Sequence, residues 1–123
     1  MSKDTIKRLR SKCDKLWALA CVKKHGNMCE LCGNSYQLQV HHFFPKGNFG
    51  HLRYNLSNGI VLCKGCHFVL HNKDISLEAE IMRVRGDEWY VDLKEKAKER
   101  PISYIKVSWY KENIEILEKY LED

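Results

Sequence analysis

Two pairs of cysteines with the same internal spacing carry the clearest chemistry in this sequence. Cys29 and Cys32 form one C-x-x-C pair, and Cys63 and Cys66 form a second pair with 30 residues between the two. Two intervening residues let both thiolates of a pair turn towards one tetrahedral ion. We therefore predict a structural Zn²⁺ bound by all four thiolates. This closed shell leaves no open position for catalysis at that ion.

The cysteine count admits one other interpretation, a disulfide scaffold in a secreted protein. The longest apolar run, residues 16–22, is too short to cross a bilayer. Two lysines follow it, where a signal-peptide cleavage site needs small residues. We therefore expect a soluble cytoplasmic protein with reduced thiols and no membrane partner. Cys13 and Cys21 are eight residues apart on an expected helix, too far to bridge, and we interpret them as partly buried small apolar residues.

Histidines gather around the second cysteine pair. Five of the six lie between the first pair and residue 72: His41, His42, His51, His67 and His71. His67 and His71 are four residues apart, so on a helix they share one face. The zinc site would fix the start of that helix and the base of the strand that carries His41 and His42. We predict that the zinc is scaffold and that these histidines converge on a second, exchangeable metal ion.

We expect neither His25 nor His51 to bind this second ion. We predict that His25 lies at the surface and that His51 is an ordinary loop residue. A condition also applies to the adjacent pair, because neighbouring residues on a flat strand point to opposite faces. His41 and His42 can share one site only if the strand bends there, near residues 43–45.

The pattern of apolar residues predicts an α+β fold. Spacings of three and four residues indicate helices, and a short alternating run indicates a strand. We predict helices over 4–24, 64–71, 76–85, 87–100 and 103–121, strands over 36–44 and 59–62, and a loop over 45–57. These elements form a single domain with three parts: a basic N-terminal helix (1–27), the Cys₄ core (28–72) and a C-terminal extension of about three helices (73–123).

Charge is distributed unevenly along the 123 residues. Residues 1–58 contain 10 Lys and Arg against 3 acidic residues, whereas residues 59–123 contain 11 against 13. A basic half is typical of a surface that contacts a polyanion. Arg8 and Lys12 on the first helix are candidate contacts to DNA phosphates, and a simply solvated basic face is the alternative.

Two segments resemble the HNH endonuclease family in its Cys₄ form. They are residues 40–45, VHHFFP, and residues 58–71, NGIVLCKGCHFVLH. Weaker supporting stretches are residues 13–17, 52–55 and 85–90. Within the family the chain is most similar to small phage members, including the Rap/NinG recombination nucleases.

The resemblance implies a ββα-metal (HNH) core and specific residue roles. The catalytic positions are His42 as general base, Asn58, which orients His42 across the loop, and His67. His41 and His67, with His71 as a third ligand, would hold one catalytic divalent cation: Mg²⁺, Mn²⁺, Ni²⁺ or Zn²⁺. Many family members have Asp at the position of His41, and the softer imidazole favours the last three ions. Lys46 and Arg53 would contact phosphates, Arg53 through its bidentate fork.

The function that the resemblance implies is metal-dependent DNA hydrolysis, by nicking or double-strand cutting. Phage DNA processing or recombination in the host cytoplasm would be its setting. The alternative is a non-catalytic zinc-stapled DNA-binding module, which would need neither His42 nor His71. A concerted double-strand cut would require a homodimer, and the sequence leaves the oligomeric state open.

Overall fold

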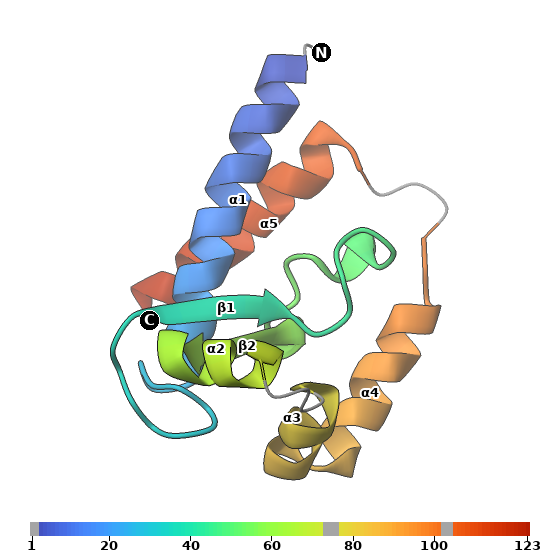
Figure 1. The fold of residues 1–123 in the computed structure, drawn as a ribbon. Coiled ribbons are helices and arrows are strands. Elements are labelled where there is room, and N and C mark those ends of the chain that lie inside the picture. The colour runs from blue at the N-terminus through green and yellow to red at the C-terminus, as the bar shows by residue number, and fades with distance from the viewer. Residues whose placement is uncertain (1–2, 73–76, 102–104) are drawn as a thin grey trace.

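A two-stranded sheet lies between helices from both ends of the chain (Figure 1). The computed structural model describes residues 3–72, 77–101 and 105–123. The helices and strands are α1 (Lys3–Lys24), β1 (Leu38–His42), β2 (Gly59–Cys63), α2 (Lys64–Asn72), α3 (Leu77–Arg85), α4 (Asp87–Lys98) and α5 (Val107–Glu122). The predicted mixture of helices with a small sheet is confirmed. Within the described residues, no helix combines the length and apolarity needed to span a bilayer.

The sheet pairs β1 antiparallel to β2 in a regular register, from Leu38 opposite Cys63 to His42 opposite Gly59. β1 is shorter than the predicted strand over 36–44. It begins at Leu38 because Gln37 has a left-handed backbone (φ 49°), which interrupts the extended conformation. The pairing stays regular to the last residue of β1, so the strand does not bend between His41 and His42.

The segment between the strands is more ordered than the predicted loop over 45–57. It contains two short 3₁₀ helices, η1 (Gly50–Leu52) and η2 (Leu56–Asn58). The Asn55 side chain caps η2 by accepting a hydrogen bond from the Ser57 backbone N–H at 2.8 Å. This folded connection brings Arg53 back towards the end of β1.

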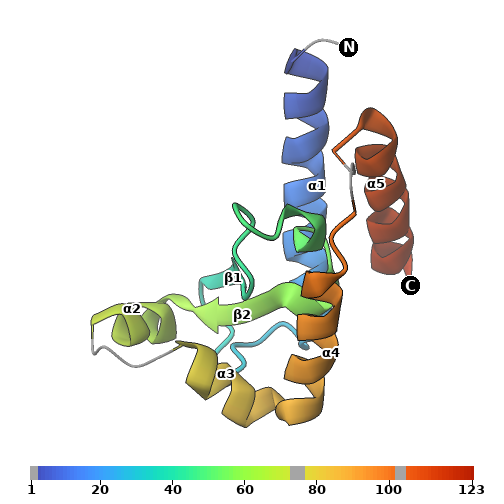
Figure 2. The ribbon, with the colours of Figure 1, turned by 90° about the vertical axis from the view of Figure 1, so that its right-hand side faces the viewer.

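α1 packs against one face of the sheet, and α5 lies side by side with α1 (Figures 1 and 2). The apolar stripe of α1 packs on α5 and on Val61 of β2. Cys13 and Cys21 are fully buried in this cluster, more deeply than the predicted partial burial. α5 begins at Val107 rather than 103, because Lys106 is extended; residues 103 and 104 lie outside the described part.

α3 and α4 enclose a second apolar cluster on the opposite face of β2. Ile60 and Leu62 point into it, whereas Val61 points to the first cluster, so β2 is buried on both faces. α4 ends at Lys98, two residues before the predicted end, because Arg100 precedes Pro101 and such a residue is disfavoured in the helical region. The expected N-cap of α3, Ser76, lies outside the described residues.

Candidate metal centre and active site

Four cysteine sulfurs converge at one end of the hairpin. The Sγ atoms of Cys29, Cys32, Cys63 and Cys66, here called the cysteine cluster, all lie within 4.8 Å of one another. A tetrahedral ion with Zn–S bonds of ~2.3 Å needs S–S distances of about 3.8 Å. The Sγ atoms of Cys32 and Cys63 are already 3.6 Å apart. The donor set therefore fits a structural zinc ion, which would join the loop after α1, the end of β2 and the first turn of α2.

Backbone N–H groups favour the thiolate form of Cys29, whereas burial and the neighbouring thiols raise the pKa of Cys66. Burial raises the pKa of Cys29, but backbone hydrogen bonds from Cys63, Cys32 and Leu31 outweigh that effect and bring the pKa down to about 7. The Cys66 backbone N–H donates to Cys63 Sγ at 3.3 Å. Thiolates are the form that binds metal, so the chain is arranged to receive an ion here.

A buried ion pair fastens the cysteine cluster to the rest of the core. Arg85 at the end of α3 donates from Nε to Glu30 Oε1 and from Nη2 to Glu30 Oε2, both at 2.7 Å. The two side chains are only 9% and 6% exposed. Arg85 also donates to the carbonyls of Ser57 and Gly59, while Glu30 accepts from the Val61 backbone N–H. Glu30 thus connects the first cysteine pair to β2 and α3.

His25 belongs to this network, so its predicted surface position is wrong. Its ring nitrogen Nε2 lies 2.8 Å from Arg85 Nη2 and accepts that hydrogen bond. Burial lowers the pKa of His25 from its ordinary value, although the charge of Glu30 opposes this shift. The neutral ring is the form that can accept from arginine.

Replacing Arg85 with alanine should strongly destabilise the fold. Removing one partner of a buried ion pair leaves an uncompensated charge, which costs about 3–5 kcal/mol. Arg83→Ala is the matched control on the same helix, because that side chain is 70% exposed and its surface ion pair contributes about 0–1 kcal/mol. Urea denaturation measures both. Equal losses in the two variants would contradict the assigned role of Arg85.

Two histidine rings, one from β1 and one from α2, stack on each other. His41 on β1 and His67 on α2 stack with ring centroids 4.2 Å apart and planes 29° from parallel. His67 follows Cys66 immediately, so the cysteine cluster fixes the position of the helical turn that carries the His67 ring. This arrangement brings together two of the three histidines predicted to hold an exchangeable ion. The third, His71, lies on α2, but its side chain is outside the described part of the structure.

His42 lies on the other face of β1. Its ring stacks on Trp17 of α1, with centroids 4.1 Å apart and planes 6° from parallel. Nε2 lies 2.9 Å from the Arg53 carbonyl oxygen. A carbonyl only accepts hydrogen bonds, so Nε2 carries the proton and Nδ1 keeps its lone pair. Burial lowers the pKa of His42, and Lys46 and Arg53 lower it further against the opposing hydrogen bond to Arg53.

The two adjacent histidines therefore do not point to a common face. The regular pairing of β1 through its last residue keeps the alternation, with His41 towards α2 and His42 towards α1. The bend that would bring both rings into one site is not present. His41 and His42 are neighbours only because they are the last two residues of β1.

Asn58 is fully buried between the two strands. Its Nδ2 donates to the carbonyls of Phe44 and Leu52, and its Oδ1 accepts from the Phe44 backbone N–H at 2.7 Å. These bonds close the loop across its base. The His42 ring donates its hydrogen bond to the carbonyl of Arg53 and not to Asn58. The closed loop holds that carbonyl in place.

Three cations line a small cavity near His42. Arg10, Lys46 and Arg53 surround about 140 Å³ together with residues of the loop and of α5. Arg53 is bound bidentately by Asp14, with Nε–Oδ1 and Nη2–Oδ2 distances of 2.9 Å. The structure thus places two of the predicted phosphate contacts, Lys46 and Arg53, together.

The two predicted contacts on α1 lie outside this cavity. Arg8 is exposed, and Lys12 lies 3.7 Å from Glu118 of α5 in an exposed ion pair.

His51, predicted to be an ordinary loop residue, lies within hydrogen-bond distance of the carbonyls of Lys96 and Ala97 at the end of α4.

Sequence reasoning missed the groups that support His42. The sequence pattern assigned no site role to Trp17, Asp14 or Arg10. One signal was available: Asp14 is among only three acidic residues in the first 58, and it stands three positions before Trp17. Residues at that spacing share a helix face.

Comparison with known proteins agrees with this geometry. Residues 29–73 match the HNH endonuclease family model. No curated protein and no solved structure matches the chain. The matched segment contains the cysteine cluster, both strands and α2, which supports a nuclease domain there. The comparisons give no support to the predicted Rap/NinG subgroup.

Proposed function

We propose that this protein is a metal-dependent DNA endonuclease that hydrolyses phosphodiester bonds. The observation that carries the proposal is the stack of His41 on His67, the residue that follows Cys66 of the cysteine cluster, inside the segment that matches the HNH model. A rigid sulfur cluster that sets the start of α2 would hold two imidazoles ready for a second ion. β1, β2 and α2 would then form the ββα-metal core.

His41 and His67, with His71, would hold the catalytic divalent cation. Such an ion supplies positive charge to a phosphoryl oxygen and to the leaving oxygen. Imidazole ligands favour Mn²⁺, Ni²⁺ or Zn²⁺ over Mg²⁺.

His42 would act as the general base. Its Nδ1 lone pair accepts a proton from the attacking water, while Trp17 and the Arg53 carbonyl fix the ring. Because His41 and His42 face opposite sides of β1, the scissile phosphate would lie across the end of that strand. Asn58 would act on His42 indirectly, because it closes the loop whose Arg53 carbonyl fixes the His42 ring.

The cavity of Arg10, Lys46 and Arg53 would take a phosphate beside the scissile one. Asp14 pairs with Arg53 of this group, and no ion pair to Arg10 or Lys46 is found among the residues that the structure describes. The cavity is smaller than the ~300–1,000 Å³ of sites for larger ligands, so it suits a phosphate rather than a nucleoside. Arg8 and Lys12 would contact phosphates of the DNA backbone further from the bond that is cut.

The alternative is a zinc-stapled DNA-binding module without catalysis. The neutral, oriented ring of His42 favours the enzyme, because binding alone needs no free Nδ1 lone pair. A role in phage DNA processing or recombination in the host cytoplasm, and assembly as a homodimer, are further predictions that rest on the resemblance alone.

A nicking assay tests the proposal. Supercoiled plasmid is incubated with the zinc-loaded protein and Mg²⁺, Mn²⁺ or Ni²⁺, with and without chelator. We expect nicking with at least one ion and a loss of about 10²–10⁴-fold in His42→Ala, the range for a general base. Zinc content and DNA affinity should be unchanged. DNA binding without nicking under every metal would favour the binding module.

A further inference from the structure

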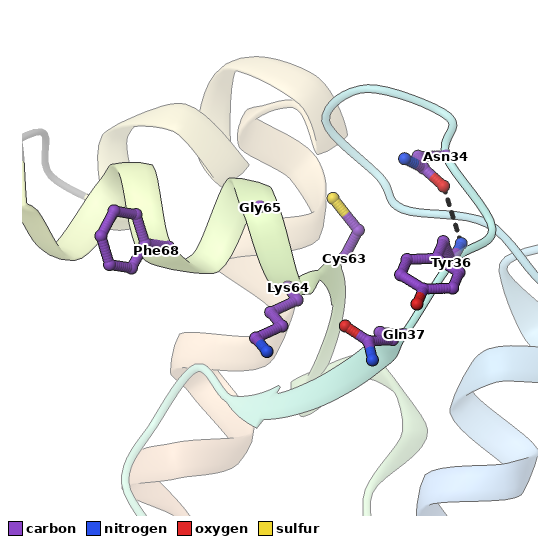
Figure 3. Close-up of a pocket in the computed structure, with 7 residues that line it drawn as sticks. All are labelled: Asn34, Tyr36, Gln37, Cys63, Lys64, Gly65 and Phe68. Atoms are coloured by element: carbon purple, nitrogen blue, oxygen red, sulfur yellow. Dashed lines mark hydrogen bonds between the residues drawn. The ribbon is translucent and has the colours of Figure 1, made fainter.

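A groove beside the cysteine cluster presents two exposed aromatic rings. It measures about 420 Å³ and is lined by the loop before β1 and by the first turns of α2 (Figure 3). Tyr36 is 69% exposed on the loop, and Phe68 is 65% exposed on α2. Lys64 and Gln37 lie between them in Figure 3. We call these four residues and the space between them the aromatic groove.

The aromatic groove continues the face that carries the candidate metal ligands. On α2, at 100° per residue, the positions of Lys64, His67 and Phe68 fall within an arc of roughly 100°. On β1, Gln39 and His41 alternate onto the same face, and Gln39 is exposed. A strand of nucleic acid that reaches His41 and His67 can therefore run over Lys64 into the groove without crossing to another face.

The chemistry of the aromatic groove suits a nucleotide. Exposed ring faces can stack on nucleobases, each stack contributing about 1–3 kcal/mol. The ammonium of Lys64 suits a phosphate, and none of the residues that line the groove is acidic. The volume falls within the usual ~300–1,000 Å³ of ligand sites.

The loop that carries Tyr36 is held in place by hydrogen bonds to Asn34. Asn34 Oδ1 accepts a hydrogen bond from the Tyr36 backbone N–H at 2.7 Å, as the dashed line in Figure 3 marks. The Cys29 backbone N–H also donates to the Asn34 carbonyl at 2.8 Å. The position of the Tyr36 ring is thus tied to the cysteine cluster, and the exposed ring stands on a fixed turn.

We propose that the aromatic groove binds an unpaired, single-stranded segment of DNA next to the bond that is cut. This inference rests on the proposed function and specifies its substrate. Bases inside a duplex are covered by their neighbours, so side-chain rings can stack only on bases that are unpaired or extruded. The protein would therefore prefer a single strand, flap or branch point to intact duplex.

Fluorescence anisotropy without the catalytic cation tests this inference separately from cleavage. The zinc-loaded protein is titrated against a labelled single-stranded oligonucleotide and against the duplex of the same sequence. We expect Tyr36→Ala and Phe68→Ala each to weaken single-strand binding by roughly 5- to 140-fold, which is 1–3 kcal/mol converted at 1.4 kcal/mol per tenfold. Duplex binding should change little, and Tyr36→Phe should bind as the wild type does.

Ile116→Ala is the matched control, because it removes an apolar side chain that is 64% exposed on α5. Zinc content and the melting curve show that each variant is folded. Single-strand binding by Tyr36→Ala and Phe68→Ala equal to that of Ile116→Ala would overturn the inference, and so would equal losses for both oligonucleotides. Plasmid nicking is measured in parallel, so an intact nuclease with no role for the groove is distinguishable from a protein that is no nuclease.

Discussion

Removing the metal from the cysteine cluster is expected to unfold the region around the sheet. Structural zinc contributes about 10–16 kcal/mol of apparent binding free energy in zinc-finger peptides, comparable to the ~5–15 kcal/mol stability of a whole domain. Here the ion would join a loop, the end of β2 and the start of α2, which are otherwise held by the hydrogen bonds of Glu30 and by part of the second apolar cluster. Cys63→Ser and a strong chelator should therefore both abolish the cooperative thermal transition of this region.

Circular dichroism and hydrogen exchange measure this effect, with zinc content determined on the same samples. Amides of residues 29–66 should lose protection, while the packed pair α1 and α5 loses less. Ser35→Ala is the control, because it changes an exposed residue of the same loop that offers no ligand. Identical melting of the zinc-loaded and zinc-free protein would show that the cluster is not a structural staple.

Replacing either histidine of the stacked pair is expected to abolish DNA cleavage while the fold is kept. Outer-shell partners of metal ligands typically contribute 10–100-fold, so the loss of a ligand itself should exceed about 100-fold. His41 and His67 are both half-buried beside the cysteine cluster, and neither belongs to the two apolar clusters. His41→Ala and His67→Ala should therefore keep their zinc and melt close to the wild type.

The control for this pair is Gln39→Ala, which changes an exposed side chain on the same face of β1. Nicking rates are measured over a range of Mn²⁺ concentrations. A shift of the activating concentration in the histidine variants and not in the control identifies a metal-binding role. Cleavage by His67→Ala at the rate of Gln39→Ala would remove that residue from the site.

The part of the fold that could be predicted from sequence is the part with strong periodicity or fixed spacing. The 3 and 4 spacing of apolar residues placed α1 to within a residue at its start and α5 along most of its length, and the paired C-x-x-C spacing predicted the convergence of four sulfurs. The ends of elements were less well predicted. Gln37 with its left-handed backbone and Arg100 before Pro101 stop their elements for local reasons that periodicity does not reveal.

The partners of the candidate site residues could be predicted less well. The bidentate pair of Asp14 and Arg53 and the stack of Trp17 on His42 join positions 39 and 25 apart in sequence, which only the packing of α1 across the sheet determines. Glu30 and Arg85 are 55 positions apart, and they meet because the end of α3 lies against the start of β2. A charge count along the chain treats such residues as surface, whereas the structure uses them to hold the cysteine cluster and the candidate base.

The most direct test of the account is anomalous diffraction from crystals of the zinc-loaded protein grown with Mn²⁺. We predict two separate metal peaks, zinc among the four cysteine sulfurs and manganese at the ring nitrogens of His41 and His67. Manganese density absent from that position, with the two rings turned away from each other, would contradict the proposed catalytic centre.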